Sequence, residues 1–133
     1  MNEIRVKRNG KEDLVFTGEE LVVVDDREWM GIAPNWWELR LYRTAVGKYI
    51  LASTFHLNYP RRGQMHGAVV FSSRSDVGEY LRECNSPNMI VEALMRRASL
   101  REMYYDRKRE LERERMQVPF VEALLEAGAS MAS

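Results

Sequence analysis

The sequence contains little cysteine, histidine or proline, and neither charge is in excess. Its 133 residues include one cysteine, two histidines and four prolines. A single cysteine, Cys84, cannot form a disulfide within the chain, which suits a reducing compartment. Twenty basic residues balance twenty acidic ones. This neutrality argues against a protein whose main role is to coat DNA or an anionic membrane.

Long hydrophobic runs are also missing. No stretch approaches the roughly 20 apolar residues that a membrane-spanning helix needs. The first eight residues, MNEIRVKR, lack the apolar core of a signal peptide. We therefore expect a soluble, cytoplasmic protein without a membrane partner. The length fits one domain, in which residues 1–84 form a sheet with a short helix and residues 85–133 form a helical segment.

The segment 36–57 predicts a β-hairpin that organises the rest of the chain. Residues 36–44 and 48–57 are rich in β-branched and aromatic side chains. Between them, Gly47 can adopt the left-handed conformation that ends a three-residue loop. Pairing Thr44 with Lys48 gives one mostly apolar face, which favours this register. On that face Leu41 lies opposite Leu51, Leu39 opposite Ser53, and Trp37 opposite Phe55.

The other face of this hairpin is chemically mixed. It carries Trp36, Glu38, Arg40 and Tyr42 on one strand, and His56, Thr54, Ala52 and Ile50 on the other. A solvated face would be more polar, so we expect either that a helix of the protein covers part of it or that it binds a ligand.

Shorter patterns predict the other elements. Strands are expected over residues 3–8, 14–16, 21–24 and 66–72, with a turn over 17–20. A loop symmetric about Arg61 would place His56 opposite His66, and Phe55 opposite Gly67. Helices are expected over 73–82, 87–116 and 120–127, and the second half of the long one is highly charged. The prediction is an α+β fold: an antiparallel β-meander of five to six strands followed by three C-terminal helices.

Two sequence patterns are similar to those of a known family. One runs Phe16-x-Gly18-x-x-Leu21 and then Trp37-Glu38-Leu39-x-Leu41-Tyr42-Arg43-Thr44-x-x-Gly47-Lys48-Tyr49. The other is Val70-Phe71-Ser72-Ser73-x-x-Asp76-Val77-x-x-Tyr80-Leu81. Over residues 14–82 the chain resembles the EXLDI family of small bacterial proteins of unknown function. The signature that names the family is absent, and the resemblance implies a fold but no catalytic residue.

Residues suited to metal binding or catalysis are few. His56 and His66 would supply only half of a zinc site, and no CxxC or HExxH motif occurs. Cys84 and a histidine could form a nucleophile and base, but a lone cysteine at a helix end is usually a small buried apolar group. No phosphate-binding glycine loop or GxSxG motif is present. We predict no metal, no cofactor and no enzymatic activity.

Binding is therefore the predicted function. We expect a non-catalytic protein-interaction module of the adaptor or inhibitor type, whose partner is another protein or a second copy of itself. The predicted helix interface comprises Leu94, Met95, Tyr105, Leu111, Phe120 and Leu124. The alternative is a nucleic-acid-binding protein that stacks bases on the mixed sheet face and contacts phosphates from a loop. Either partner would use Trp36, Arg40, Tyr42, His56, Arg61, Arg62 and His66.

Overall fold

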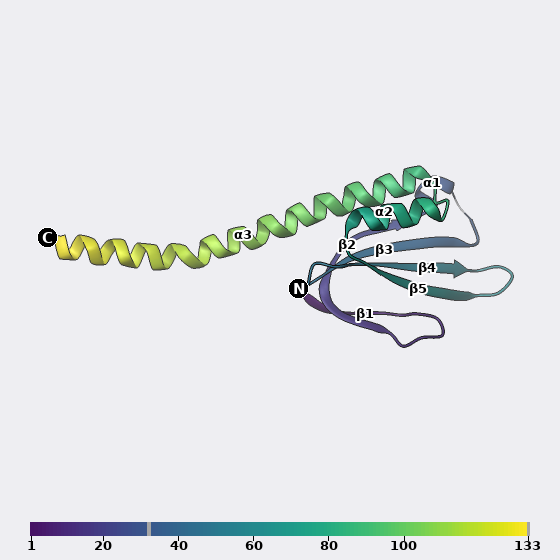
Figure 1. The fold of residues 1–133 in the computed structure, drawn as a ribbon, viewed down its shortest axis with the longest axis horizontal. Helices are drawn as coiled ribbons and strands as arrows, with labels where there is room; N and C mark the ends of the chain where they lie inside the picture. Colours follow the sequence, from purple (N-terminus) through teal and green to yellow (C-terminus); the bar gives the residue numbers. More distant parts are fainter. Residues whose placement is uncertain (32, 133) are drawn as a thin grey trace. The chain divides into compact units, whose positions relative to one another are not determined.

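A computed structural model shows an α+β fold, as predicted (Figure 1). Five strands form one antiparallel sheet in chain order, a β-meander. They are β1 (Asn2–Val6), β2 (Leu14–Asp25), β3 (Trp36–Thr44), β4 (Tyr49–Leu57) and β5 (Gly63–Phe71). The helices are α1 (Arg27–Met30), α2 (Arg74–Glu83) and α3 (Asn88–Ala132).

The structure describes the backbone of residues 1–31 and 33–132, and the side chains of residues 1–29, 31 and 33–116. Contacts divide the chain into two units, Met1–Ser99 and Leu100–Ser133, which are described separately below. The separate last helix predicted over residues 120–127 is wrong, because α3 continues through these residues without a break. The side chains of Phe120 and Leu124 lie outside those that the structure describes. Within the described part of the chain, no helix combines the length and apolar character needed to cross a bilayer.

The central hairpin has the predicted register. Trp37 pairs with Phe55, Leu39 with Ser53 and Leu41 with Leu51, and the mixed-face pairs also match the prediction. The Thr44 N–H donates to the Lys48 carbonyl over 2.8 Å, and Gly47 has a φ of 81°. Turn chemistry and apolar alternation therefore specify the same pairing, and the prediction is confirmed.

The prediction of two separate strands over residues 14–16 and 21–24 is wrong, because residues 14–25 form the single strand β2. The stretch 17–20, expected to turn, continues the strand, and its pairing with β3 shifts at a bulge between Glu20 and Val22. Gly18 does not mark a turn. A Cβ atom there would lie 2.4 Å from the Arg43 carbonyl oxygen, so glycine permits a close approach of two backbones.

The bulge lets β2 contribute to two separate apolar layers. An extra residue in a strand exchanges the faces on which later side chains lie. Before the bulge, Phe16 contacts Tyr42 edge-on, with ring centroids 5.5 Å apart. After it, Val22 and Val24 pair with Leu41 and Leu39, on the sheet face that the helices cover.

The helix-covered face holds the larger core. The helix α2 and the first turns of α3 lie over it (Figure 1), and their side chains Leu81 and Ile90 line the same space as Leu39 and Leu51 of the sheet. The Ser73 hydroxyl caps α2 by accepting a hydrogen bond from the Asp76 N–H over 3.2 Å. The largest fully buried side chains of this unit are Val24, Leu41, Val77, Val91 and Leu94, and Leu21, Leu51, Leu81 and Ile90 are nearly so.

The mixed face of the central hairpin is partly covered, but by strands and not by a helix, which was one of the two alternatives expected. The sheet curls so that β1 and the first half of β2 close over it. Twist and a bulge bend a sheet in this way. The resulting second core is formed by Val6, Tyr42, Ile50 and Ala52, with Ile4, Leu14, Phe16 and Ala68 packed against it.

Candidate functional site

The open end of the mixed face carries a stack of side chains centred on Trp36. The indole of Trp36 lies against the His56 ring, with centroids 3.8 Å apart and planes 16° apart. The two residues are directly opposite in the β3–β4 ladder. The guanidinium carbon of Arg27 lies 3.5 Å from the centroid of the same indole. The ring of Trp36 is therefore already engaged by a cation and by an imidazole.

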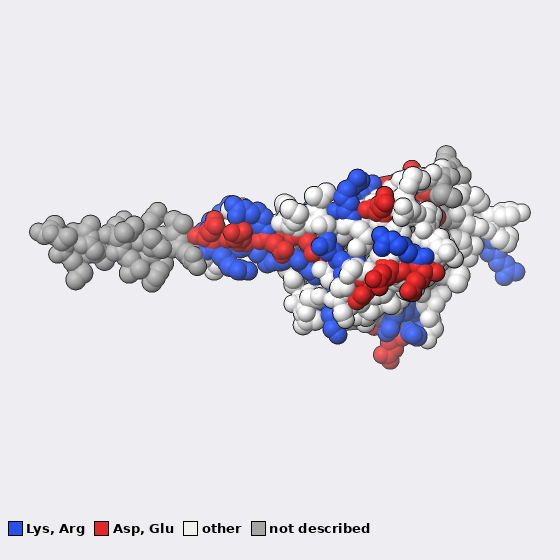
Figure 2. Space-filling view, turned by 45° about the horizontal axis from the view of Figure 1, so that its top comes forward, with Lys and Arg blue, Asp and Glu red and all other residues white. Residues whose placement is uncertain are grey.

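Ion pairs neutralise the charges around this stack. Arg40 donates to Glu38 over 2.7 Å and to Glu20 over 2.9 Å, and the hydrogen bond to Glu38 raises the pKa of Arg40. Arg27 donates to Asp25 over 2.6 Å, and this hydrogen bond lowers the pKa of Asp25. Acidic and basic groups are likewise interleaved over the face in Figure 2. Because Arg27 and Arg40 are paired with carboxylates, the described side chains around this stack attract a polyanion only weakly.

The two histidines are not opposite each other, so that prediction is wrong. His56 pairs with Gln64, and His66 pairs with Thr54. The β4–β5 loop is two residues shorter than predicted, because hydrogen bonds from its backbone to the Asn35 side chain hold it in this form. The Asn35 side chain accepts hydrogen bonds from two loop N–H groups, over 3.0 and 3.3 Å, and donates to a loop carbonyl. Phe55 therefore faces Met65 rather than Gly67.

The residues predicted to contact a partner are thus divided between surface and interior. Arg61 and Arg62 are exposed in the β4–β5 loop, and Trp36, Arg40, His56 and His66 are partly buried. Tyr42 is only 9% exposed and belongs to the second core. Burial raises the pKa of Tyr42. No group of three or more His, Cys, Asp or Glu side chains in the described residues is arranged to hold a metal ion.

On the helix-covered face, a row of three large apolar residues reaches the edge of the sheet. Trp37 lies opposite Phe55, and Phe55 opposite Met65. The Trp37 and Phe55 rings are 4.7 Å apart, and Trp37 is 45% exposed. Sequence reasoning paired Trp37 with Phe55 but missed Met65, because an incorrect register placed Gly67 there.

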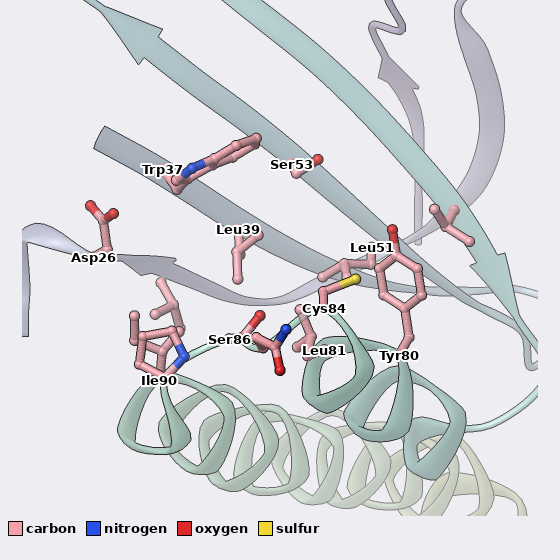
Figure 3. Close-up of a pocket in the computed structure, with 14 residues that line it drawn as sticks. Asp26, Trp37, Leu39, Leu51, Ser53, Tyr80, Leu81, Cys84, Ser86 and Ile90 are labelled. Carbon is pink, nitrogen blue, oxygen red and sulfur yellow. The ribbon is translucent and has the colours of Figure 1, made fainter. Parts of the chain in front are cut away.

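This row adjoins a pocket of about 400 Å³ between the sheet and the helices (Figure 3). Its sheet wall includes Leu39 and Leu51, and its helix wall includes Leu81 and Ile90. Polar residues also line it. They are Asp26, Ser53, Tyr80, Cys84, Asn85 and Ser86. Sequence reasoning did not find this pocket, because its lining comes from β2–β5, α2, α3 and the connections between them.

Cys84 lies at the C-terminal end of α2, on the pocket side of the sheet. It is exposed. Burial and the neighbouring Cys84 raise the pKa of Tyr80. His56 and His66 belong to the opposite face, with Thr54 and Ala52. The sheet therefore separates the thiol from both imidazoles and does not form the nucleophile–base pair considered above.

The predicted helix interface is only partly at the surface. Leu94 is fully buried, and Met95 is partly buried near Gly78. Tyr105 is partly buried, and its ring lies 5.7 Å from that of Tyr104. Leu111 is exposed. Exposed apolar residues of α3 outside the predicted helix interface include Leu100, Met103 and Tyr104.

Comparison with known proteins identifies no relative. No family model, curated protein or solved structure matches this chain. The resemblance to the EXLDI family remains a prediction based on the quoted residues.

Proposed function

We propose that this protein is a non-catalytic protein-interaction module that pairs with a second copy of itself through the exposed helix. One observation supports this most directly. Leu100, Met103, Tyr104 and Leu111 are 60%, 65%, 53% and 42% exposed. At 3.6 residues per turn they lie along one side of α3. We call these four residues the apolar stripe.

The composition of the apolar stripe suits a protein contact. Aromatic and methionine side chains are enriched at the centres of protein interfaces. An exposed row of apolar residues on a helix costs solvation free energy that burial against another surface recovers. The stripe begins at Leu100, the first residue of the second unit.

The charges beside the stripe offer one complementary pair to a second copy in antiparallel orientation. Arg107, Lys108 and Arg109 precede Leu111, and Glu112 and Glu114 follow it, interleaved with Arg113 and Arg115. In an antiparallel pair centred on Leu111, Lys108 of each copy would lie level with Glu114 of the other. In such a two-fold interface both copies use the same surface and make the same contacts. Within one chain, Arg107 lies 3.1 Å from Glu110, and this exposed pair can exchange at little cost.

The test is light scattering on the full chain after size exclusion, at about 100 µM. We expect a mass of twice the 15.6 kDa chain in both 50 mM and 500 mM NaCl, because apolar contacts resist salt. Leu111→Glu should give the monomer. Arg113→Glu, on the opposite side of the helix, is the matched control and should remain dimeric. A wild-type monomer, or a dimer that Leu111→Glu leaves intact, would overturn the proposal.

The same experiment tests the nucleic-acid alternative. The support for that alternative is the exposed pair Arg61 and Arg62, beside a shallow depression that includes Trp36 and Gln64. The engagement of Trp36 and the burial of Tyr42 weaken it, since base stacking requires open aromatic faces. A protein that carries 260 nm-absorbing material at 50 mM NaCl, and loses it at 500 mM, would favour this alternative.

A further inference from the structure

The strand β5 forms one edge of the sheet. It pairs with β4 on one side, and no described strand pairs with its other side. In an antiparallel ladder, the N–H and C=O groups of alternate residues point toward the neighbouring strand, and those of the residues between them point away. The N–H and C=O groups of His66 both bond to Asn9, outside the β4 ladder. The same groups of Ala68 and Val70 therefore also point away from β4.

Asn9 closes only part of this edge. From the connection between β1 and β2 it donates to the His66 carbonyl and accepts from the His66 N–H, each over 3.0 Å. Among the described residues, none hydrogen-bonds to the outward N–H and C=O groups of Ala68 and Val70. These two donors and two acceptors have the spacing that the backbone of an added strand requires.

The side chains beside these groups are apolar on both faces of the edge. Val69 is 37% exposed and Val70 is 50% exposed, although consecutive side chains of a strand point to opposite faces. Proteins commonly protect an exposed apolar edge from pairing by placing charged residues or proline on it. The strand β5 contains no Asp, Glu, Lys, Arg or Pro, whereas β1, at the other edge, contains Glu3 and Arg5.

We propose that the β5 edge binds an extended segment of a partner protein as an added antiparallel strand. The segment exchanges backbone hydrogen bonds with Ala68 and Val70, and an exposed edge recognises an extended peptide in this way. The residue of the segment opposite Val69 lies on the helix-covered face, and the residue opposite Val70 lies on the mixed face. Both are apolar and uncharged, because each packs beside an exposed valine.

The length of the free edge favours a short segment over a second folded copy of the chain. The Asn9 contact at His66 limits the edge at one end, and α2, which begins at Arg74, limits it at the other. A contact of so few residues buries far less than the roughly 1,200–2,000 Å² of a stable interface between folded proteins. Backbone hydrogen bonds to an extended peptide do not need so large a surface.

The probe is the peptide KTVVVTK with blocked ends, titrated into the ¹⁵N-labelled full chain. Two derivatives carry the same number of N-methyl groups. Methyl groups on the third and fourth residues block both edges of the peptide strand, whereas methyl groups on the third and fifth residues block one edge and leave the other intact. We expect the consecutively methylated peptide to bind at least about tenfold more weakly than the other two. Amide exchange at Ala68 and Val70 should become slower in the complex.

A pair of variants locates the contact on β5. Val70→Pro removes an N–H group that points away from β4, so the existing ladder is kept. Binding of the unmodified peptide should become about fivefold weaker, as the loss of one backbone hydrogen bond predicts. Val70→Thr retains both the N–H group and the branched shape of the side chain, and should bind the peptide as the wild type does.

Several results would overturn the proposal. They are equal affinity of the two methylated peptides, unchanged affinity in Val70→Pro, slowed exchange in β1 instead of β5, and no binding at millimolar concentration. Slower exchange at Ala68 and Val70 as the concentration of the free protein rises would assign the edge to a second copy. Circular dichroism melts establish that both variants fold. If Val70→Pro does not fold, the comparison of the two methylated peptides on the wild type decides.

This inference goes beyond the self-association proposed above. The strand β5 belongs to the unit Met1–Ser99, and the apolar stripe belongs to the unit Leu100–Ser133. The peptide titration is therefore repeated on Leu111→Glu, which should bind the peptide as the wild type does. Loss of self-association and loss of peptide binding are thus measured separately, and either proposal can fail without the other.

Discussion

Gly18 and Arg43 approach so closely that a Cβ atom on Gly18 would lie 2.4 Å from the Arg43 carbonyl oxygen. This contact joins β2 to β3 just before the bulge, beside the hydrogen bond from the Ala45 N–H to the Thr17 carbonyl. The backbone conformation of Gly18 does not require glycine, because its φ is not positive. The requirement for glycine is therefore one of space.

Gly18→Ala should destabilise the protein by about 1–3 kcal/mol, because the added methyl group displaces a backbone atom that cannot move independently of the sheet. Urea unfolding followed by circular dichroism measures the change. Gly63→Ala is the matched control, since a Cβ atom there meets nothing within 4 Å. Equal stability of the two variants would contradict the assignment of Gly18 to a close contact.

Asn35→Ala should loosen the β4–β5 loop. Its side chain hydrogen-bonds to the Asn58 and Tyr59 backbone, and loss of these bonds should cost about 1–3 kcal/mol. Amide hydrogen exchange at Asn58 and Tyr59 should become faster. Asn58→Ala, which leaves the backbone donor in place, should change exchange little. If the two variants behave alike, Asn35 does not determine the loop.

Tyr42→Phe should change stability at high pH. Burial raises the pKa of Tyr42, and the nearby Glu20 raises it further. The neutral form is therefore favoured in the folded state. The contribution of Tyr42 to stability is fully present below the unfolded pKa of about 10. It is lost as pH rises through that value toward the folded pKa.

The measurement for Tyr42 is the free energy of unfolding in urea from pH 8 to 11. The wild type should lose more stability over this range than Tyr42→Phe, which has no group to ionise. Tyr59→Phe is the control, because that side chain is 70% exposed, and it should follow the wild type. Parallel curves for wild type and Tyr42→Phe would show that burial does not raise the pKa of Tyr42.

The central hairpin was predictable because its determinants are local. Gly47 sets the loop, and the alternation of apolar residues on both arms rejects every register shifted by one. The start of α3 was predictable to within one residue for a similar reason, since Pro87 and the spacing of Val91, Leu94 and Ala98 are visible in the sequence, and the helix begins at Asn88. Both features depend on residues close together in the chain.

The β4–β5 register was not predictable in this way. A shift of two residues keeps every side chain on its own face, so the apolar pattern cannot reject it. Phe55 therefore lay on the predicted face although its partner is Met65 and not Gly67. Asn35 settles the register from more than twenty residues away, and a hydrogen bond of such range leaves no trace in local sequence.

The amino-acid sequence by itself determined the fold class, the central hairpin and the position of the two longer helices after the last strand, because propensity, periodicity and turn chemistry act over a few residues. Tertiary structure alone decided that β2 is one strand serving two cores, that Tyr42 is interior, and that Asp26 borders a pocket. Those outcomes depend on where the sheet bends and on which distant segments meet. Their physical cause is long-range packing, which short-range patterns do not encode.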